Sequence, residues 1–117
     1  MLNRAAVLVR YKEPAVRWIN EADPDPEART LTLSEVNEEH TVYLISDGDA
    51  DTKDTLARWI KHNYDWLFEA ELEGWYTDES LWPQNRTLKM FREWFTVECH
   101  TVILDTVDRE ELYDDEI

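Results

Sequence analysis

Short apolar runs constrain the fold of this chain more than any other feature. The first run, residues 5–9, has the length of a β-strand. No run approaches the ~20 apolar residues that a membrane-spanning helix needs. Other segments repeat their apolar residues at three- and four-residue spacing, which is typical of amphipathic helices. The pattern therefore predicts a mixed α+β fold with no part in a membrane.

Four segments are predicted to be strands. Residues 30–36 alternate apolar and polar side chains with a period of two, which puts Leu31 and Leu33 on one face. The polar residues 37–40 separate this segment from residues 41–46, so the two are expected to form a β-hairpin. The other two predicted strands are residues 4–11 and 96–104.

Helices are predicted between these strands. Residues 14–22 are amphipathic and begin with a proline, which suits the first turn of a helix. Residues 53–73 have apolar side chains at helical spacing, and Asn63 leaves open whether they form one helix or two. Gly74 is expected to end this stretch in the left-handed conformation. Residues 86–95 are predicted to form a further helix.

The predicted order is strand, helix, strand, strand, helix, strand. This is the ferredoxin-like β-α-β-β-α-β sandwich, here with extra helices before the last strand. A chain of 117 residues suits one domain, and we expect a single α+β domain over residues 1–105. Residues 106–117 are strongly acidic, and they are expected to form a flexible C-terminal tail.

Helices cover only one face of such a sheet, and apolar residues remain for the other face. The strand at 41–46 is apolar on both faces. An exposed apolar face needs a cover, and a second copy of the chain is the simplest one, because two-fold dimers are the commonest assembly. The C-terminal tail or residues 74–85 are alternative covers. The residues assigned to a dimer face are Leu8, Tyr43, Ile45, His100, Val102 and Leu104.

Residues 74–86 combine large aromatic side chains with amide, hydroxyl, acidic and guanidinium groups. Aromatic anchors beside a few polar groups are typical of binding pockets and interface hot spots. The alternative is a structural connection with its tryptophans in the core, which a small domain needs. We expect Arg86 to pair with Asp78 or Glu79. The candidate binding residues are Trp75, Tyr76, Asp78, Glu79, Trp82, Asn85 and Arg86.

Residues 47–51 place carboxylates at the first, third and fifth positions of an EF-hand loop. Thr52 and Arg58 then stand where that loop needs glycine and glutamate, which argues against calcium. We expect Asp51 to cap the following helix instead, with Asp54 in the capping-box position.

No catalytic residues, metal site or cofactor are predicted. Cys99 and His100 are adjacent in a predicted strand, so their side chains point to opposite faces and do not activate each other. The spacing of histidines and cysteines matches no transition-metal motif. A small enzyme remains an alternative, with a pocket near residues 74–86 and with His62, Asp78 and Glu79 as acid–base groups.

The net charge of −15 limits the kinds of molecule that the chain can bind. A surface this negative repels phosphates, so direct binding of nucleic acid is not expected. An acidic mimic of nucleic acid that engages a DNA-binding protein is an alternative. The single cysteine favours a reducing compartment, and the first residues lack the pattern of a signal peptide, so we expect a cytoplasmic location.

The run GWYTDESLWPQNRTLKMFREWF at residues 74–95 and the run VECHTVIL at 97–104 resemble a family of small acidic bacterial proteins of uncharacterised activity. The resemblance implies a bacterial, cytoplasmic setting and no particular activity. Taken together, the sequence favours a non-catalytic interaction domain. We expect it to form a homodimer and to bind a protein partner through the open sheet face or through residues 74–86.

Overall fold

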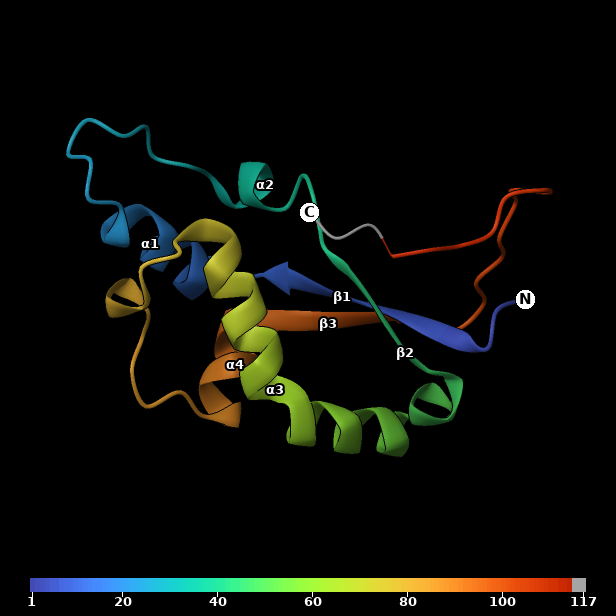
Figure 1. The fold of residues 1–117 in the computed structure, drawn as a ribbon. Coiled ribbons are helices and arrows are strands. Elements are labelled where there is room, and N and C mark those ends of the chain that lie inside the picture. Colours follow the sequence, from blue (N-terminus) through green and yellow to red (C-terminus); the bar gives the residue numbers. More distant parts are fainter. Residues whose placement is uncertain (115–117) are drawn as a thin grey trace.

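Strand β1 (Arg4–Tyr11) lies at the centre of an antiparallel sheet (Figure 1). The structure is a computed structural model and describes residues 1–114. The sheet order is β2-β1-β3, with β2 (Val42–Ser46) and β3 (Phe95–His100) at its edges. The helices are α1 (Glu13–Ala22), α2 (Leu33–Val36), α3 (Lys53–Trp75) and α4 (Leu88–Trp94), and two 3₁₀ turns are η1 (Asp47–Ala50) and η2 (Glu79–Leu81).

The described residues therefore form a mixed α+β fold with three strands, not four. The predicted strand at 30–36 is wrong, because this segment contains α2, and the ferredoxin-like order is not confirmed. Thr32 caps α2 by accepting a hydrogen bond from the backbone N–H of Glu35, whose side chain accepts from the Thr32 N–H. This reciprocal cap satisfies two backbone donors locally, and here it prevails over the period-two pattern of Leu31 and Leu33.

Helix α3 is one helix of 23 residues, which settles the question that Asn63 left open. Its N-cap is Thr52, one residue after the predicted Asp51. The helix also continues through Gly74, whose φ is not positive, so the predicted left-handed cap is wrong. The chain leaves the helix at Tyr76 in an extended conformation.

An aromatic cluster joins α3, α4 and the start of β3. The ring of Phe68 lies 5.9 Å from that of Phe91 and 5.3 Å from that of Phe95, in edge-to-face arrangements. Tyr11 meets Phe95 at 5.0 Å and so connects the cluster to β1. Aromatic pairs at such distances stabilise by about 0.5–1.5 kcal/mol beyond the area they bury. The cluster fixes α3 against the sheet.

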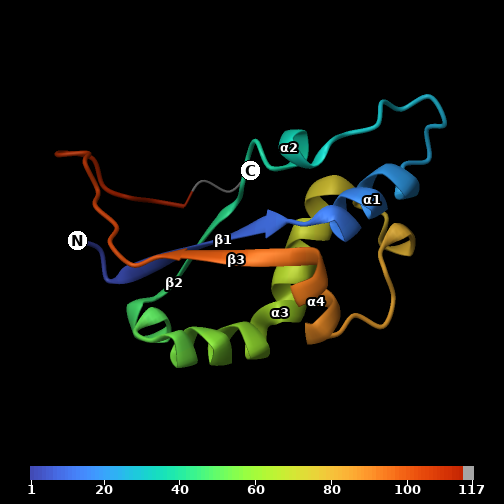
Figure 2. The same cartoon turned by 180° about the vertical axis from the view of Figure 1, so that it is seen from behind.

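Helices α3 and α4 lie on one side of the sheet, α1 follows beyond the end of β1, and no helix of residues 1–114 lies across the other face (Figure 2). We call the other side the uncovered sheet face. Tyr43 and Ile45 lie on the covered side, where Ile45 is buried and Tyr43 packs against the core, so their assignment to a dimer face is wrong. Period-two alternation could not decide this, because both sets of alternate residues in β2 are apolar. The uncovered sheet face carries Leu8, Val42, Leu44, Glu98 and His100.

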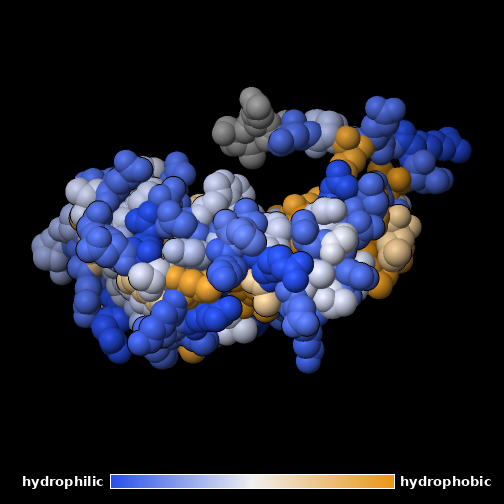
Figure 3. Space-filling view, turned by 90° about the horizontal axis from the view of Figure 1, so that it is seen from below, coloured by the Kyte–Doolittle hydropathy of each residue, from blue (hydrophilic) through white to orange (hydrophobic). Residues whose placement is uncertain are grey.

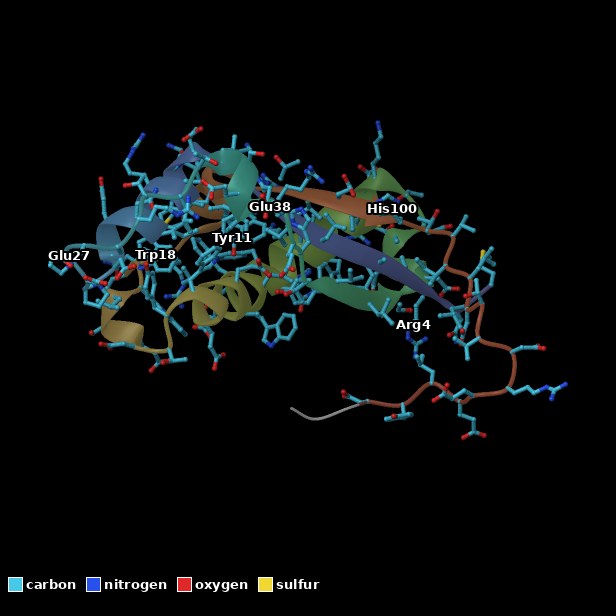
Figure 4. The ribbon with its side chains drawn as sticks, turned by 90° about the horizontal axis from the view of Figure 1, so that it is seen from above. Arg4, Tyr11, Trp18, Glu27, Glu38 and His100 are labelled. Carbon is cyan, nitrogen blue, oxygen red and sulfur yellow. The ribbon has the colours of Figure 1, made fainter. Side chains whose placement is uncertain are left out.

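The last strand ends at His100, earlier than predicted, and residues 101–114 have no helix or strand. Val102 and Leu104 therefore lie beyond the sheet and are exposed. The segment bends away from the body (Figure 4). It contributes to a radius of gyration of 16.1 Å, against about 13 Å for a compact domain of this length. Residues 115–117 of the predicted tail lie outside the described residues.

Within residues 1–114, no helix has both the length and the apolar composition to cross a membrane. Seen from below, the surface is mostly hydrophilic, and apolar side chains gather where the C-terminal segment leaves the body (Figure 3).

Candidate functional site

The aromatic side chains of residues 74–86 are held by contacts within the chain. The Trp82 indole is 8% exposed, and its Nε1 donates to the Tyr76 carbonyl at 2.7 Å. The Tyr76 hydroxyl donates to the carbonyl of Ile19, and Trp18 Nε1 donates to the carbonyl of Leu81 at 3.0 Å. These two hydrogen bonds hold the segment against α1. Trp82 belongs to the core and Trp75 packs against it, which agrees with the structural alternative for these two residues.

The polar residues of this segment also have partners within the chain. The predicted pairing of Arg86 with Asp78 or Glu79 is wrong. Its side chain is 14% exposed, and its guanidinium lies 2.9 Å from Asp65 and 2.6 Å from Glu69, both on α3. Asp65 and Glu69 are four residues apart in α3, so their carboxylates lie on one side of the helix, about one turn apart.

Asp78 and Asn85 shape turns. Asp78 accepts from the N–H of Ser80 at 3.0 Å and from its hydroxyl at 2.7 Å, and these bonds hold the pKa of Asp78 below its usual value. Asn85 has φ 56°, the left-handed region that asparagine tolerates better than most residues. Glu79 is exposed in η2.

Trp75 differs from its neighbours because it belongs to a buried polar network. Its Nε1 lies 3.0 Å from the hydroxyl of Tyr11, which in turn donates to Glu71 Oε1 at 2.8 Å. Tyr43 donates its hydroxyl to Glu71 Oε2. Glu71 is only 9% exposed, so two phenol donors satisfy a carboxylate that has been taken almost entirely out of water.

Burial is the main cause that raises the pKa of both Tyr11 and Tyr43, and the hydrogen bond to Glu71 and its negative charge raise it further. Both phenols therefore stay protonated and keep donating. The two hydrogen bonds tie Glu71 on α3 to Tyr11 on β1 and to Tyr43 on β2. The network is better suited to holding β1, β2 and α3 together than to acid–base chemistry.

Sequence analysis missed Glu71. The signal that could have found it is its position on α3, where it shares the buried stripe of Leu67, Phe68 and Leu72. A charged residue in an apolar stripe needs partners when it is buried, and neighbouring strands with tyrosines could supply them.

The network borders a cleft of about 430 Å³, which we call the acidic cleft. It lies between the end of β1, the segment after α2 and the last turns of α3. Figure 4 shows Tyr11 and Glu38 near each other, between Trp18 and Glu27 on one side and Arg4 and His100 on the other. Neither lysine nor arginine lines the cleft. Its acidic lining residues are Glu35, Glu38, Glu39 and Glu71.

A second cleft of about 470 Å³, the apolar hollow, lies between β2 and the middle of α3. Trp66 stands beside it with 60% of its surface exposed, in edge-to-face contact with Tyr43 at 5.7 Å. A tryptophan this exposed at the rim of a hollow is typical of a binding surface, and sequence analysis assigned Trp66 no such role. The other lining residues are Val42, Tyr43, Leu44, Ile45, Trp59 and Asn63.

The remaining reactive side chains are dispersed. His62 is exposed on α3, with Nδ1 2.8 Å from the Arg58 carbonyl. Cys99 lies on the covered face, and burial raises the pKa of its thiol. His100 lies 2.8 Å from Glu98 on the uncovered sheet face, and this bond lowers the pKa of Glu98. Within residues 1–114, no three histidine, cysteine or acidic residues are grouped to hold a metal ion.

Comparison with known proteins finds no matching family model, no matching curated protein and no matching solved structure.

Proposed function

We propose that this chain is a non-catalytic cytoplasmic interaction domain that forms a homodimer through its uncovered sheet face. Val42 and Leu44 carry the proposal, because they are 56% and 50% exposed on a face over which no described helix lies. Large apolar side chains at alternate positions of a strand share a face, and they gain free energy when a partner removes them from water.

The face has the composition of an interface. Leu8 lies opposite Val42, and Ala6 lies opposite Leu44, which makes an apolar strip across β1 and β2. On the other side of β1, the polar Glu98 and His100 form a rim. An apolar centre beside a polar rim is typical of protein interfaces. A two-fold axis would place the strip of one copy on the strip of the other.

Val102 and Leu104 belong to this proposal as flanking contacts. Both are exposed just beyond the end of β3. They lie outside the sheet, so we expect them at the margin of the interface, where substitutions cost less affinity than at its centre.

Sedimentation velocity over a range of protein concentrations tests the proposal. We expect a monomer–dimer equilibrium for the unchanged chain and a monomer for Leu44→Asp, because a carboxylate would enter the centre of the apolar strip. Ser46→Asp is the matched control, since it adds the same charge to the same strand, on the same face, at an exposed polar position. A monomer at all concentrations, or equal dimerisation of both variants, would contradict the proposal.

A further inference from the structure

We infer that the outer edge of β2 and the facing side of α3 bind an extended segment of a protein partner, one with apolar residues at one end and lysine or arginine at the other. The inference goes beyond the proposed dimer, because it uses the outer edge of β2 and helix α3, although Val42 and Leu44 border both this edge and the uncovered sheet face. Its evidence is the position of the apolar hollow and of the acidic cleft.

The apolar hollow follows the edge of β2. Four consecutive residues, 42–45, line it, and in a strand such residues point alternately to opposite faces. Because their side chains alternate, the four residues can line one hollow together only along the backbone edge of the strand. β2 pairs only with β1, and no other described backbone hydrogen bond reaches its outer edge. An unpaired strand edge is a template for a further strand.

The opposite wall of the hollow supplies side-chain specificity. Trp59, Asn63 and Trp66 follow each other at spacings of four and three residues, so they share one side of α3. An added strand would direct every second side chain toward this wall. The exposed indole of Trp66 offers it a large apolar contact.

The acidic cleft continues the same line. One wall passes from residues 42–45 in the hollow to 38–41 in the cleft, and the other passes from Trp66 to Ala70 and Gly74 along α3. We call the two together the β2–α3 furrow. Tyr43 joins the two parts, because it packs against Trp66 and donates to Glu71.

Charge selects the occupant of the furrow. Glu38 and Glu39 are exposed at its acidic end, and neither forms an ion pair with a described residue. Glu35 at the same end already holds the guanidinium of Arg29 at 2.7 Å, which shows that this wall accepts arginine. The C-terminal segment of the chain is itself strongly acidic, and a second copy carries the same net charge of −15. Electrostatic complementarity therefore favours a basic partner over either.

Selection from a displayed library of random eight-residue peptides tests the inference, with the whole chain as bait. Both strand pairs in this sheet are antiparallel. An antiparallel addition to β2 would bring the C-terminal end of the peptide to the acidic cleft. We expect the enriched peptides to have alternating apolar residues and a basic C-terminal end. No enrichment, or enrichment without basic residues, would overturn the inference.

Variants locate the binding site with the best enriched peptide as the probe. Trp66→Ala is expected to weaken binding at least tenfold, and it should fold normally because Trp66 is exposed. The double variant Glu38→Gln and Glu39→Gln is expected to weaken binding and to reduce its dependence on salt. Its matched control is Glu110→Gln with Glu111→Gln, which removes two equally exposed charges from the C-terminal segment.

The remaining outcomes separate this inference from the proposed dimer. Methylating alternate backbone nitrogens of the peptide should abolish binding if it adds to β2, and unchanged binding would overturn strand addition. Equal affinity for Trp66→Ala and the unchanged chain would overturn the site. If sedimentation shows that Trp66→Ala no longer dimerises, the furrow binds a second copy of the chain. This result would overturn the inference that it binds a basic partner.

Discussion

Asn37 pairs with the backbone of Tyr11 as a neighbouring strand would. Its Oδ1 accepts from the Tyr11 N–H at 2.8 Å, and its Nδ2 donates to the Tyr11 carbonyl at 3.0 Å. The pairing of β1 with β2 ends at Leu8 and Val42, so the last residues of β1 have no strand on that side. One side-chain amide thus satisfies two backbone groups that would otherwise lose their partners.

Asn37→Ala is expected to lower the free energy of unfolding by about 2 kcal/mol, because it leaves a part-buried donor and acceptor of Tyr11 unpaired. Urea denaturation followed by circular dichroism measures the change. Asn3→Ala is the control, since Asn3 is exposed and bonds only to its neighbour Arg4, and it should change little. Equal values for the two variants would contradict the role of Asn37.

The N-cap of α3 gives a second test, in which two adjacent residues have opposite expectations. Thr52 accepts from the N–H of Thr55 at 3.1 Å, whereas Asp51 precedes the cap. Thr52→Ala should cost about 1 kcal/mol of stability, and Asp51→Ala less than about 0.5 kcal/mol. Thermal and urea unfolding of both variants measure this. A larger loss of stability for Asp51→Ala than for Thr52→Ala would show that Asp51 caps the helix, as the sequence predicts.

Arg86→Lys is expected to loosen residues 76–87 despite keeping the charge. A lysine ammonium cannot reproduce the separate bonds that the guanidinium makes to Asp65, to Glu69 and to the carbonyl of Pro83. Amide hydrogen exchange should become faster in this segment. Arg92→Lys, on the exposed surface of α4, is the control. Unchanged protection in the Arg86 variant would show that the aromatic contacts alone hold the segment.

Alkaline pH is expected to destabilise the fold through Tyr11 and Tyr43. Burial is the first cause that raises the pKa of both phenols above their usual value of 10.0, and Glu71 adds to it. The stability they contribute is fully present below pH 10, where both states keep the proton. It is lost as pH rises further, because the unfolded chain then releases protons that the folded chain retains.

Urea denaturation between about pH 8 and pH 11 measures this loss, a range that brackets the usual pKa of tyrosine. The double variant Tyr11→Phe with Tyr43→Phe should show a weaker decline of stability above pH 10 than the unchanged chain. Tyr113→Phe, in the exposed C-terminal segment, should decline as the unchanged chain does. Equal slopes for all three would contradict the assignment.

Elements with strong local signals could be predicted from the sequence. β1, the long helix α3 and the helix before β3 lie where apolar spacing placed them. Residues 30–36 could be misjudged because their alternation agrees with a strand while Thr32 and Glu35 form a helix cap. The outcome depends on how the backbone groups at the end of β1 find hydrogen-bond partners. The side chain of Asn37 bonds to the backbone of Tyr11, so no strand is required there.

The candidate site was harder to predict, because its residues come together from distant parts of the chain. Tyr11, Tyr43 and Glu71 are close only once β1, β2 and α3 are packed. The aromatic segment was conspicuous in the sequence for a structural reason, since Trp82 fills the core. Trp66 carried no distinct signal, because helical spacing cannot tell whether the edge of an apolar stripe is covered.

The central place of β1 has a consequence during synthesis. β1 is synthesised before its neighbour β3, which spans residues 95–100, so one side of β1 stays open until those residues have left the ribosome. A nascent chain at this stage presents the apolar Ala5, Val7 and Val9 on a strand without its second partner. Such unpaired apolar strands are prone to aggregate, and they are the segments that molecular chaperones need to shield.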